Sequence, residues 1–195
     1  MSKILSLILV LGITSSIYAQ GVLSAFRSQT VVPSAVPTAT ATISVGDAFK
    51  KFQTLHDLRE IVSAAHDYRQ AVRYTVQMLE LTITMERKDI QAWQLNNMGW
   101  YIISEFKLAT KYTASIEQLK LLAPADKKIA VAALQERCRA QLSSLLLAKT
   151  YLTDAWELNQ SLYPTAVNKK DLKEQTRAIE SNLRFIDWVT NFVQK

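Results

Sequence analysis

Apolar residues recur every three or four positions along this chain from residue 46 onward. One stripe of apolar residues with this spacing begins the region, and three others occupy residues 102–119, 134–156 and 172–193. Steps of three and four place side chains on one face of an α-helix, and such a seam packs helices at shallow angles, as in coiled coils. The spacing predicts four helices, near 46–86, 89–123, 125–163 and 169–195. The stripe of the first helix consists of Leu55, Leu58, Val62, Ala65, Val72, Val76, Leu79 and Ile83.

Prolines and short polar side chains mark the ends of these helices. Pro124 and Pro164 each fall between two stripes, and proline lacks the N–H that a helix interior needs. Two pairs resemble capping boxes with aspartate in place of glutamate, namely Ser44 with Asp47 and Asn168 with Asp171. Because short connections make neighbouring helices antiparallel, we expect an all-α fold, an elongated antiparallel bundle of three to four long helices over residues 46–195.

The first 19 residues have the pattern of a secretory signal peptide. Lys3 precedes an apolar run at residues 4–13, which is shorter than the roughly 20 residues that span a bilayer. Polar residues follow, and the small Ala19 stands before Gln20, as at a cleavage site. We interpret residues 1–19 as a cleaved signal peptide and the protein as exported, with an uncleaved membrane anchor as the alternative.

Residues 20–45 differ in composition from the rest of the chain. They are rich in Ser, Thr, Ala, Val and Pro, and their apolar residues follow no helical period. Such a segment is typical of a flexible leader or linker. The alternative is an extended segment that adds as a strand to a partner.

Charge and cysteine content narrow the class of protein only slightly. The chain carries a net charge of +6 at pH 7, which permits acidic partners without requiring nucleic acid. In the charged run at 168–177, acidic residues are interspersed among the basic ones, so we expect a solvated helix face and no direct nucleic-acid partner. Cys138 is the only cysteine, so an exported protein of this sequence has no internal disulfide.

No motif for catalysis or for a cofactor stands out. His56 and His66 are ten residues apart, about 15 Å along one helix and on different faces, so they do not share a metal. There is no HExxH, no CxxC and no glycine-rich phosphate loop. We therefore predict a non-enzymatic protein with no catalytic residue, cofactor, metal or small-molecule substrate.

Arg69 interrupts the first apolar stripe. One interpretation is a buried charge that meets a carboxylate and fixes the register of the helices. The other, which we prefer, is an aliphatic stem lying on the seam with the guanidinium in water.

Aromatic residues near the C-terminus form a second apolar face on the last predicted helix. Phe185, Trp188 and Phe192 step by three and four and lie nearly opposite Leu183, Ile186 and Val193. A bundle covers both faces only if this helix is central or is overlaid by another. Otherwise the aromatic face is exposed, and exposed apolar patches mark interfaces. Phe185, Trp188 and Phe192 are therefore candidates for an interaction surface.

Two further tryptophans are candidates for the same kind of surface. Trp93 and Trp100 flank the stretch QLNNMG, which is a poor helix interior. The stretch predicts a kink or a small irregular appendage at this point. The two indoles then either fill the core at the bend or contribute to an interaction surface.

The order of these features resembles a known family. A signal ending in Ala-Gln and a low-complexity leader precede a long helix and an irregular turn. Next come a helix ending IEQLKLLAP at residues 116–124, a charged restart ADKK, and another long helix. Over roughly residues 47–160, this order resembles the exported helical proteins of conjugative type IV secretion operons and is similar to their minor pilus subunits.

The resemblance implies a function but assigns no role to any residue. It implies a non-enzymatic exported component of a DNA-transfer apparatus, in the periplasm or at the surface of a Gram-negative bacterium. Its partners are then other protein subunits of the secretion or pilus assembly, with membrane contact only through them. The alternatives are a free periplasmic binding or chaperone-like protein and a small hydrolase with an unrecognised site.

Overall fold

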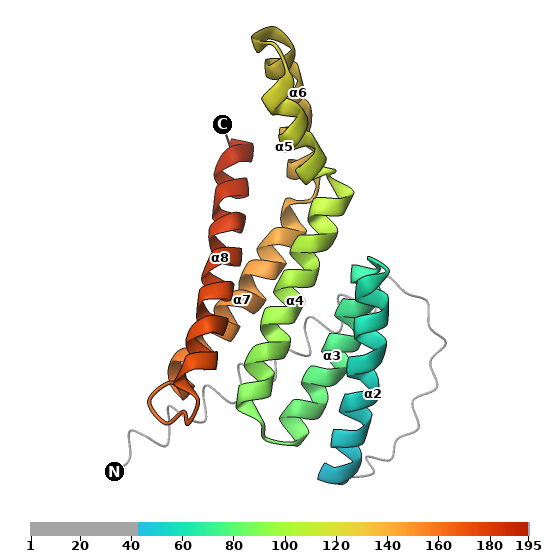
Figure 1. Cartoon of the computed structure of the whole chain (residues 1–195), viewed down its shortest axis with the longest axis vertical. Helices are drawn as coiled ribbons and strands as arrows, with labels where there is room; N and C mark the ends of the chain where they lie inside the picture. Colours follow the sequence, from blue (N-terminus) through green and yellow to red (C-terminus); the bar gives the residue numbers. More distant parts are fainter. Residues whose placement is uncertain (1–42, 195) are drawn as a thin grey trace. The chain divides into compact units, whose positions relative to one another are not determined.

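The computed structural model describes residues 43–194, which form seven helices and no strand (Figure 1). The all-α prediction is confirmed for these residues. The predicted signal peptide and all but the last three residues of the predicted leader lie outside the described part. The expected three to four long helices are not confirmed, because the helices are more numerous and of moderate length: α2 (Val45–Ala64), α3 (Tyr68–Thr84), α4 (Lys88–Ala109), α5 (Tyr112–Leu121), α6 (Pro124–Ala140), α7 (Leu142–Leu162) and α8 (Lys169–Gln194).

Helices α4 and α7 form the centre of residues 43–194 (Figure 1). They pack against each other, α3 lies against α4, α2 lies against α3, and α8 lies against α7. Helices α5 and α6 form a hairpin that continues beyond one end of the central pair. The aromatic face predicted for the last helix contacts Phe106 of α4 and Tyr112 of α5, so it lies near the base of this hairpin.

The predicted helix 46–86 is wrong, because the chain reverses direction after α2. His66 adopts a left-handed conformation with φ of 60°, and the Asp67 N–H donates to the Val62 carbonyl oxygen at 2.9 Å. These features define a Schellman motif, which usually has glycine at the left-handed position. Asp67 then caps α3 by accepting from the Gln70 N–H at 3.0 Å. The apolar stripe was continuous in sequence only by coincidence.

A second Schellman motif separates α3 from α4, and a third left-handed residue separates α4 from α5. Glu86 has φ of 55°, and the Arg87 N–H donates to the Thr82 carbonyl oxygen at 3.0 Å. Lys111, with φ of 53°, interrupts the predicted helix 89–123. Since none of the three left-handed residues is glycine, the usual sequence signal for these breaks is missing.

Other predicted helix ends are confirmed. Pro124 is the first residue of α6, and Pro164 lies between α7 and α8. The Ser44 hydroxyl oxygen accepts from the Asp47 N–H at 3.1 Å at the start of α2. The Asn168 side chain stands before α8 and accepts from the Asp171 N–H at 3.4 Å. Short polar side chains satisfy N–H groups that a helix start leaves free, so these ends could be predicted.

Gly99 lets the two central helices approach closely. The kink or small irregular appendage predicted at residues 94–99 is wrong, because α4 runs without interruption through them. A Cβ atom placed on Gly99 would lie 2.5 Å from Cγ of the fully buried Leu152 on α7. Leucine therefore packs directly on the backbone of α4, and glycine is required here for its lack of a side chain.

Several polar side chains are buried between the helices of the described part. Asn96, Tyr151, Asn159 and Gln175 are each less than a tenth exposed, and each has a side-chain atom with no hydrogen-bond partner among residues 43–194. Burial without a partner costs about 1–3 kcal/mol for each such group. The core is therefore less stable than its apolar residues alone would make it.

We expect Gly99→Ala to lower the free energy of unfolding by about 1–2 kcal/mol, because overpacking outweighs the gain in helix propensity. Gly46→Ala is the matched control, since its Cβ would meet only the Ser44 hydroxyl oxygen at 3.9 Å. Urea denaturation of the purified protein measures both. Equal stability of the two variants would contradict the close approach of α4 and α7.

Tyr151→Phe should raise the free energy of unfolding by up to about 1 kcal/mol, because it removes a buried hydroxyl without a partner. Burial, reinforced by the charge of Asp154, raises the pKa of Tyr151 to about 12 from the ordinary 10.0. The folded state holds this proton more tightly than the unfolded state. The free energy of unfolding of the wild type is therefore unaffected by this group below pH 10 and falls as the pH rises toward 12.

The variant should therefore lose less stability than the wild type between about pH 8 and about pH 11. Denaturation at the two pH values measures the difference. Some alkaline loss remains, because burial also raises the pKa of Tyr112 to about 12. An unchanged pH profile would show that Tyr151 ionises as freely in the folded state as in the unfolded chain.

Candidate interaction surface

Helix α8 has a core side and an aromatic side. The core side carries four fully or almost fully buried residues, Ile179, Ile186, Val189 and Val193. On the aromatic side, Phe185 and Phe192 are half-buried, whereas 47% of the Trp188 surface is exposed. The structure thus places Phe185 against the neighbouring helices and leaves half of Trp188 accessible.

Five rings connect this side of α8 to the core of the described residues. The centroids of Phe106 and Phe185 are 6.2 Å apart, and those of Tyr112 and Phe185 are 5.4 Å apart, both edge-to-face. Tyr112 also meets Trp188 edge-to-face at 6.0 Å, and Trp188 stacks on Phe192 at 5.1 Å. We call these five residues the aromatic cluster. Such arrangements are favourable and directional, so they fix the orientation of the exposed indole.

Side chains of α6 hold the C-terminal ends of α4 and α8 beside the aromatic cluster. Gln135 Nε2 donates to the Phe192 carbonyl oxygen at 2.8 Å, and Arg139 Nη2 donates to that of Val193 at 2.9 Å. Arg137 Nε donates to the Thr110 carbonyl oxygen at 3.0 Å. The last carbonyls of a helix lack intrahelical partners and carry partial negative charge, so two arginines suit them well.

A lysine and a thiol adjoin the aromatic cluster. The Lys107 ammonium lies 4.4 Å from the centroid of Phe185, and burial lowers the pKa of Lys107. Burial is also the main cause that raises the pKa of Tyr112, with a smaller contribution from the Cys138 thiol. Cys138 itself is fully buried, and burial raises the pKa of its thiol. The surface beside Trp188 therefore combines apolar rings with a positive charge.

Trp93 and Trp100 lie on α4 and are 46% and 43% exposed. Trp100 contacts Tyr68 and Tyr101, with centroids 6.0 Å and 5.0 Å away. The interpretation of two indoles filling the core at a bend is wrong, because both are about half exposed on an uninterrupted helix. Within residues 43–194, no ring contact connects either indole to the aromatic cluster. The five sequence candidates thus do not form one patch.

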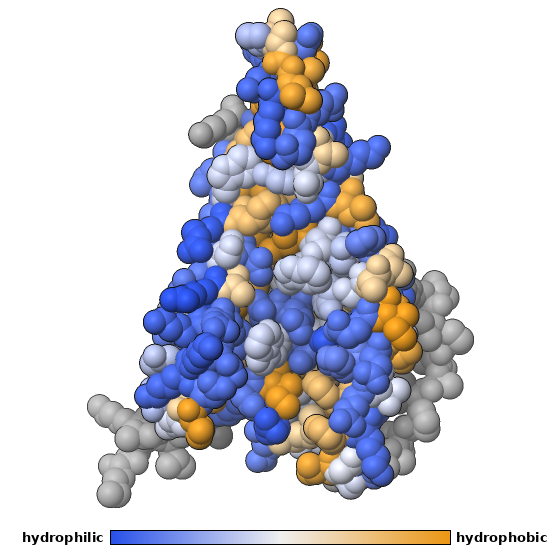
Figure 2. All heavy atoms as spheres, viewed as in Figure 1, coloured by the Kyte–Doolittle hydropathy of each residue, from blue (hydrophilic) through white to orange (hydrophobic). Residues whose placement is uncertain are grey.

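Two strongly exposed apolar side chains near the tip of the α5–α6 hairpin were not predicted. Leu121 is 88% exposed and Ile129 is 72% exposed. Figure 2 shows hydrophobic side chains gathered on this hairpin at the top of the view. The sequence feature that could have predicted exposed apolar residues here is the apolar run that continues to Pro124, where the chain must turn.

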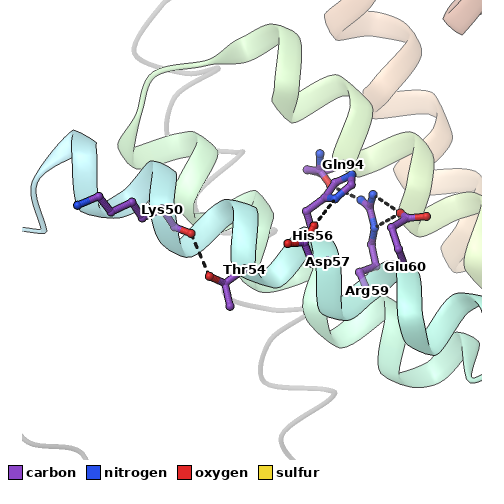
Figure 3. Close-up of polar contacts among 7 residues, drawn as sticks. All are labelled: Lys50, Thr54, His56, Asp57, Arg59, Glu60 and Gln94. Carbon is purple, nitrogen blue, oxygen red and sulfur yellow. Dashed lines mark hydrogen bonds and ion pairs between the residues drawn. The ribbon is translucent and has the colours of Figure 1, made fainter.

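Arg59, rather than Arg69, is the buried arginine (Figure 3). Only 5% of Arg59 is exposed, and its Nη1 donates to the buried Gln94 Oε1 at 3.1 Å. Its Nη2 donates to Glu60 Oε1 at 2.7 Å. The contacts join α2 to α4. Sequence reasoning missed this residue, although its position four residues after Leu55 is a core position of a helix.

The guanidinium of Arg69 lies in water, as expected, but the stem does not lie on a helix seam as the same interpretation required. Its side chain is 78% exposed, and its Nε is 2.8 Å from Glu105 Oε1, so the guanidinium also meets a carboxylate. Exposed pairs of this kind contribute at most about 1 kcal/mol. The residue does not bury a charge in the seam.

The two histidines lie apart, each with a local contact. His56 Nδ1 is 3.5 Å from Asp57 Oδ1, and His66 Nδ1 is 2.9 Å from the Tyr68 hydroxyl oxygen. In residues 43–194, no three His, Cys, Asp or Glu side chains come close enough to share a metal ion. The same residues include no helix with the length and hydropathy of a membrane span.

Comparisons with protein families, with curated proteins and with solved structures found no match.

We expect Trp188→Ala to lower the free energy of unfolding by about 1–2 kcal/mol, because half of the indole is exposed and its ring contacts are lost. Phe106→Ala, in the same cluster but 1% exposed, should cost about 3–5 kcal/mol. Thermal and urea denaturation of both variants provide the comparison. Equal losses would show that Trp188 serves the core alone.

Proposed function

We propose that this protein is a non-enzymatic, exported component of a conjugative DNA-transfer apparatus of the type IV secretion class. It works in the periplasm or at the cell surface of a Gram-negative bacterium, through helix-mediated contacts with other protein subunits. The observation that carries the proposal is the half-exposed Trp188 on the aromatic cluster. The type of assembly is inferred from the order of features in the sequence, which resembles that of conjugative type IV secretion proteins.

The geometry of Trp188 supports a binding role. Interfaces take most of their affinity from a few aromatic and arginine side chains, and binding is weakened by the entropy lost when loose side chains are immobilised. Trp188 is already held by Tyr112 and Phe192, and Phe185 connects these rings to the buried Phe106. The indole of Trp188 is therefore already immobilised, and a partner that covers it loses little side-chain conformational entropy.

The helical framework supports the same role. Under this proposal, α4 with α5 and α6 with α7 act as two long antiparallel rods, with α8 beside them, and the bundle presents surfaces to neighbouring subunits. The hydrogen bonds from Arg137 and Arg139 join α6 to the ends of α4 and α8 near Trp188. Rigid helices position binding side chains more accurately than loops do.

Deleting the gene in the host that carries it should strongly lower the frequency at which the conjugative element passes to recipient cells. A wild-type copy should restore transfer, and a Trp188→Ala copy should restore much less. Counting transconjugants per donor measures the effect. Trp156→Ala, which changes an indole 37% exposed on α7, is the matched control and should restore transfer fully.

Immunoblots of periplasmic fractions check that all variants accumulate equally. Transfer that is unaffected by the deletion would contradict the proposal. Unaffected transfer together with aggregation of other envelope proteins would indicate the free chaperone-like alternative instead.

A further inference from the structure

The solvent side of α8 carries a regular row of positive charges that ends at Trp188. Lys170, Arg177 and Arg184 are spaced seven residues apart, and Trp188 follows four residues later; all four are exposed. Seven residues make almost two helical turns, so the three cations share one side of the helix, and i,i+4 neighbours are adjacent. We call these four residues the basic–aromatic strip. Figure 2 shows the surface over α8, at the left of the view, to be mainly hydrophilic.

The cations of the basic–aromatic strip have no ion-pair partner among residues 43–194. Lys149, by contrast, pairs with Asp187 on another side of α8, with Nζ 2.8 Å from Oδ1. Glu174 lies beside Lys170 and Arg177, within one helical turn of each, but pairs with neither of them. Like charges along one helix repel, so the row is a surface that gains from an opposite charge.

The helices that face this end of α8 add positive charge. Lys107 on α4 lies 4.4 Å from the ring of Phe185, and Lys111 directly precedes Tyr112 of the aromatic cluster. Neither lysine pairs with a carboxylate in the described part of the chain. The surroundings of Trp188 are therefore apolar at the centre and basic at the margin.

We infer that the basic–aromatic strip docks an acidic amphipathic helix of a partner protein. Its carboxylates lie opposite Lys170, Arg177 and Arg184, and an apolar side chain of the same helix packs against Trp188. Identifying the partner as a subunit of the transfer apparatus rests on the proposed function, whereas its chemistry does not. From Lys170 to Trp188 the strip extends about 27 Å, which corresponds to five turns of a docked helix.

The spacing favours a helix over single-stranded nucleic acid. Charges at seven-residue intervals match carboxylates at the same intervals on a second helix, as in the flanking pairs of coiled coils. Proteins that hold single strands offer successive aromatic rings on which bases stack. The basic–aromatic strip has one such ring, and Phe192 already occupies a face of it at 5.1 Å with the planes 12° apart.

The test uses the mature protein and three probes at low salt. The first is a synthetic amphipathic peptide of about three heptads with Leu on one face and Glu at the flanking positions. The second replaces every Glu by Lys, and the third is a single-stranded oligonucleotide of about 20 nucleotides. Isothermal titration calorimetry should show binding of the Glu peptide, with affinity at least about tenfold higher than for the Lys peptide.

Charge reversal locates the binding surface. The triple variant Lys170→Glu, Arg177→Glu and Arg184→Glu should weaken binding of the Glu peptide about tenfold or more. The matched control reverses three exposed lysines elsewhere, Lys51→Glu, Lys127→Glu and Lys128→Glu, with the same change in net charge. It should retain affinity within about twofold. Circular dichroism confirms that both variants are folded.

Three results would overturn the inference: equal affinity for the Glu and Lys peptides, equal loss in both triple variants, or tighter binding of the oligonucleotide through the same three cations. The outcome is separable from that of the proposed function. Transfer that depends on Trp188 but not on the three cations defeats only this inference. Peptide binding that depends on the cations, in a protein dispensable for transfer, defeats only the proposed function.

Discussion

The contact of Leu152 with the backbone of α4 at Gly99 sets the distance between the two central helices, and the other elements follow from it. Because the helices approach so closely, Ala148 and Ala155 on α7 are fully buried beside Leu152. Helices α3 and α8 then pack against the outer sides of this pair. A larger residue at position 99 would separate α4 from α7 and so displace every helix that depends on them.

The same pair determines where the aromatic cluster forms. Helices α5 and α6 continue beyond α4 and α7 as a hairpin, which brings the polar side chains of α6 to the C-terminal ends of α4 and α8. Arg137 donates to a carbonyl oxygen at the end of α4, and Arg139 donates to one at the end of α8. Because both helix ends are held by one element, Phe106 and Phe185 meet in a fixed geometry.

Sequence periodicity predicted the helical class and the helix starts at Ser44, Pro124 and Asn168, because these signals are local. It failed at His66 and Lys111, where the left-handed residue is not glycine and the apolar stripe stays in phase across the break. The break near Glu86 was predicted correctly. It also misread Gly99 and overlooked Arg59, since both depend on residues of a distant helix. For Trp188 it offered two alternatives, because the choice depends on Tyr112, which lies far away in the chain.

Lys111 lies where α4 ends, directly before Tyr112 of the aromatic cluster. Helix α4 stops at Ala109, and the left-handed Lys111 separates it from α5. Tyr112, the first residue of α5, meets the indole only with an edge-to-face contact. The left-handed residue costs about 1–2 kcal/mol, and next to Tyr112 half of Trp188 is accessible at the end of the basic–aromatic strip. Because Tyr112 begins α5, a partner that covers the exposed half of Trp188 must reach the base of the α5–α6 hairpin.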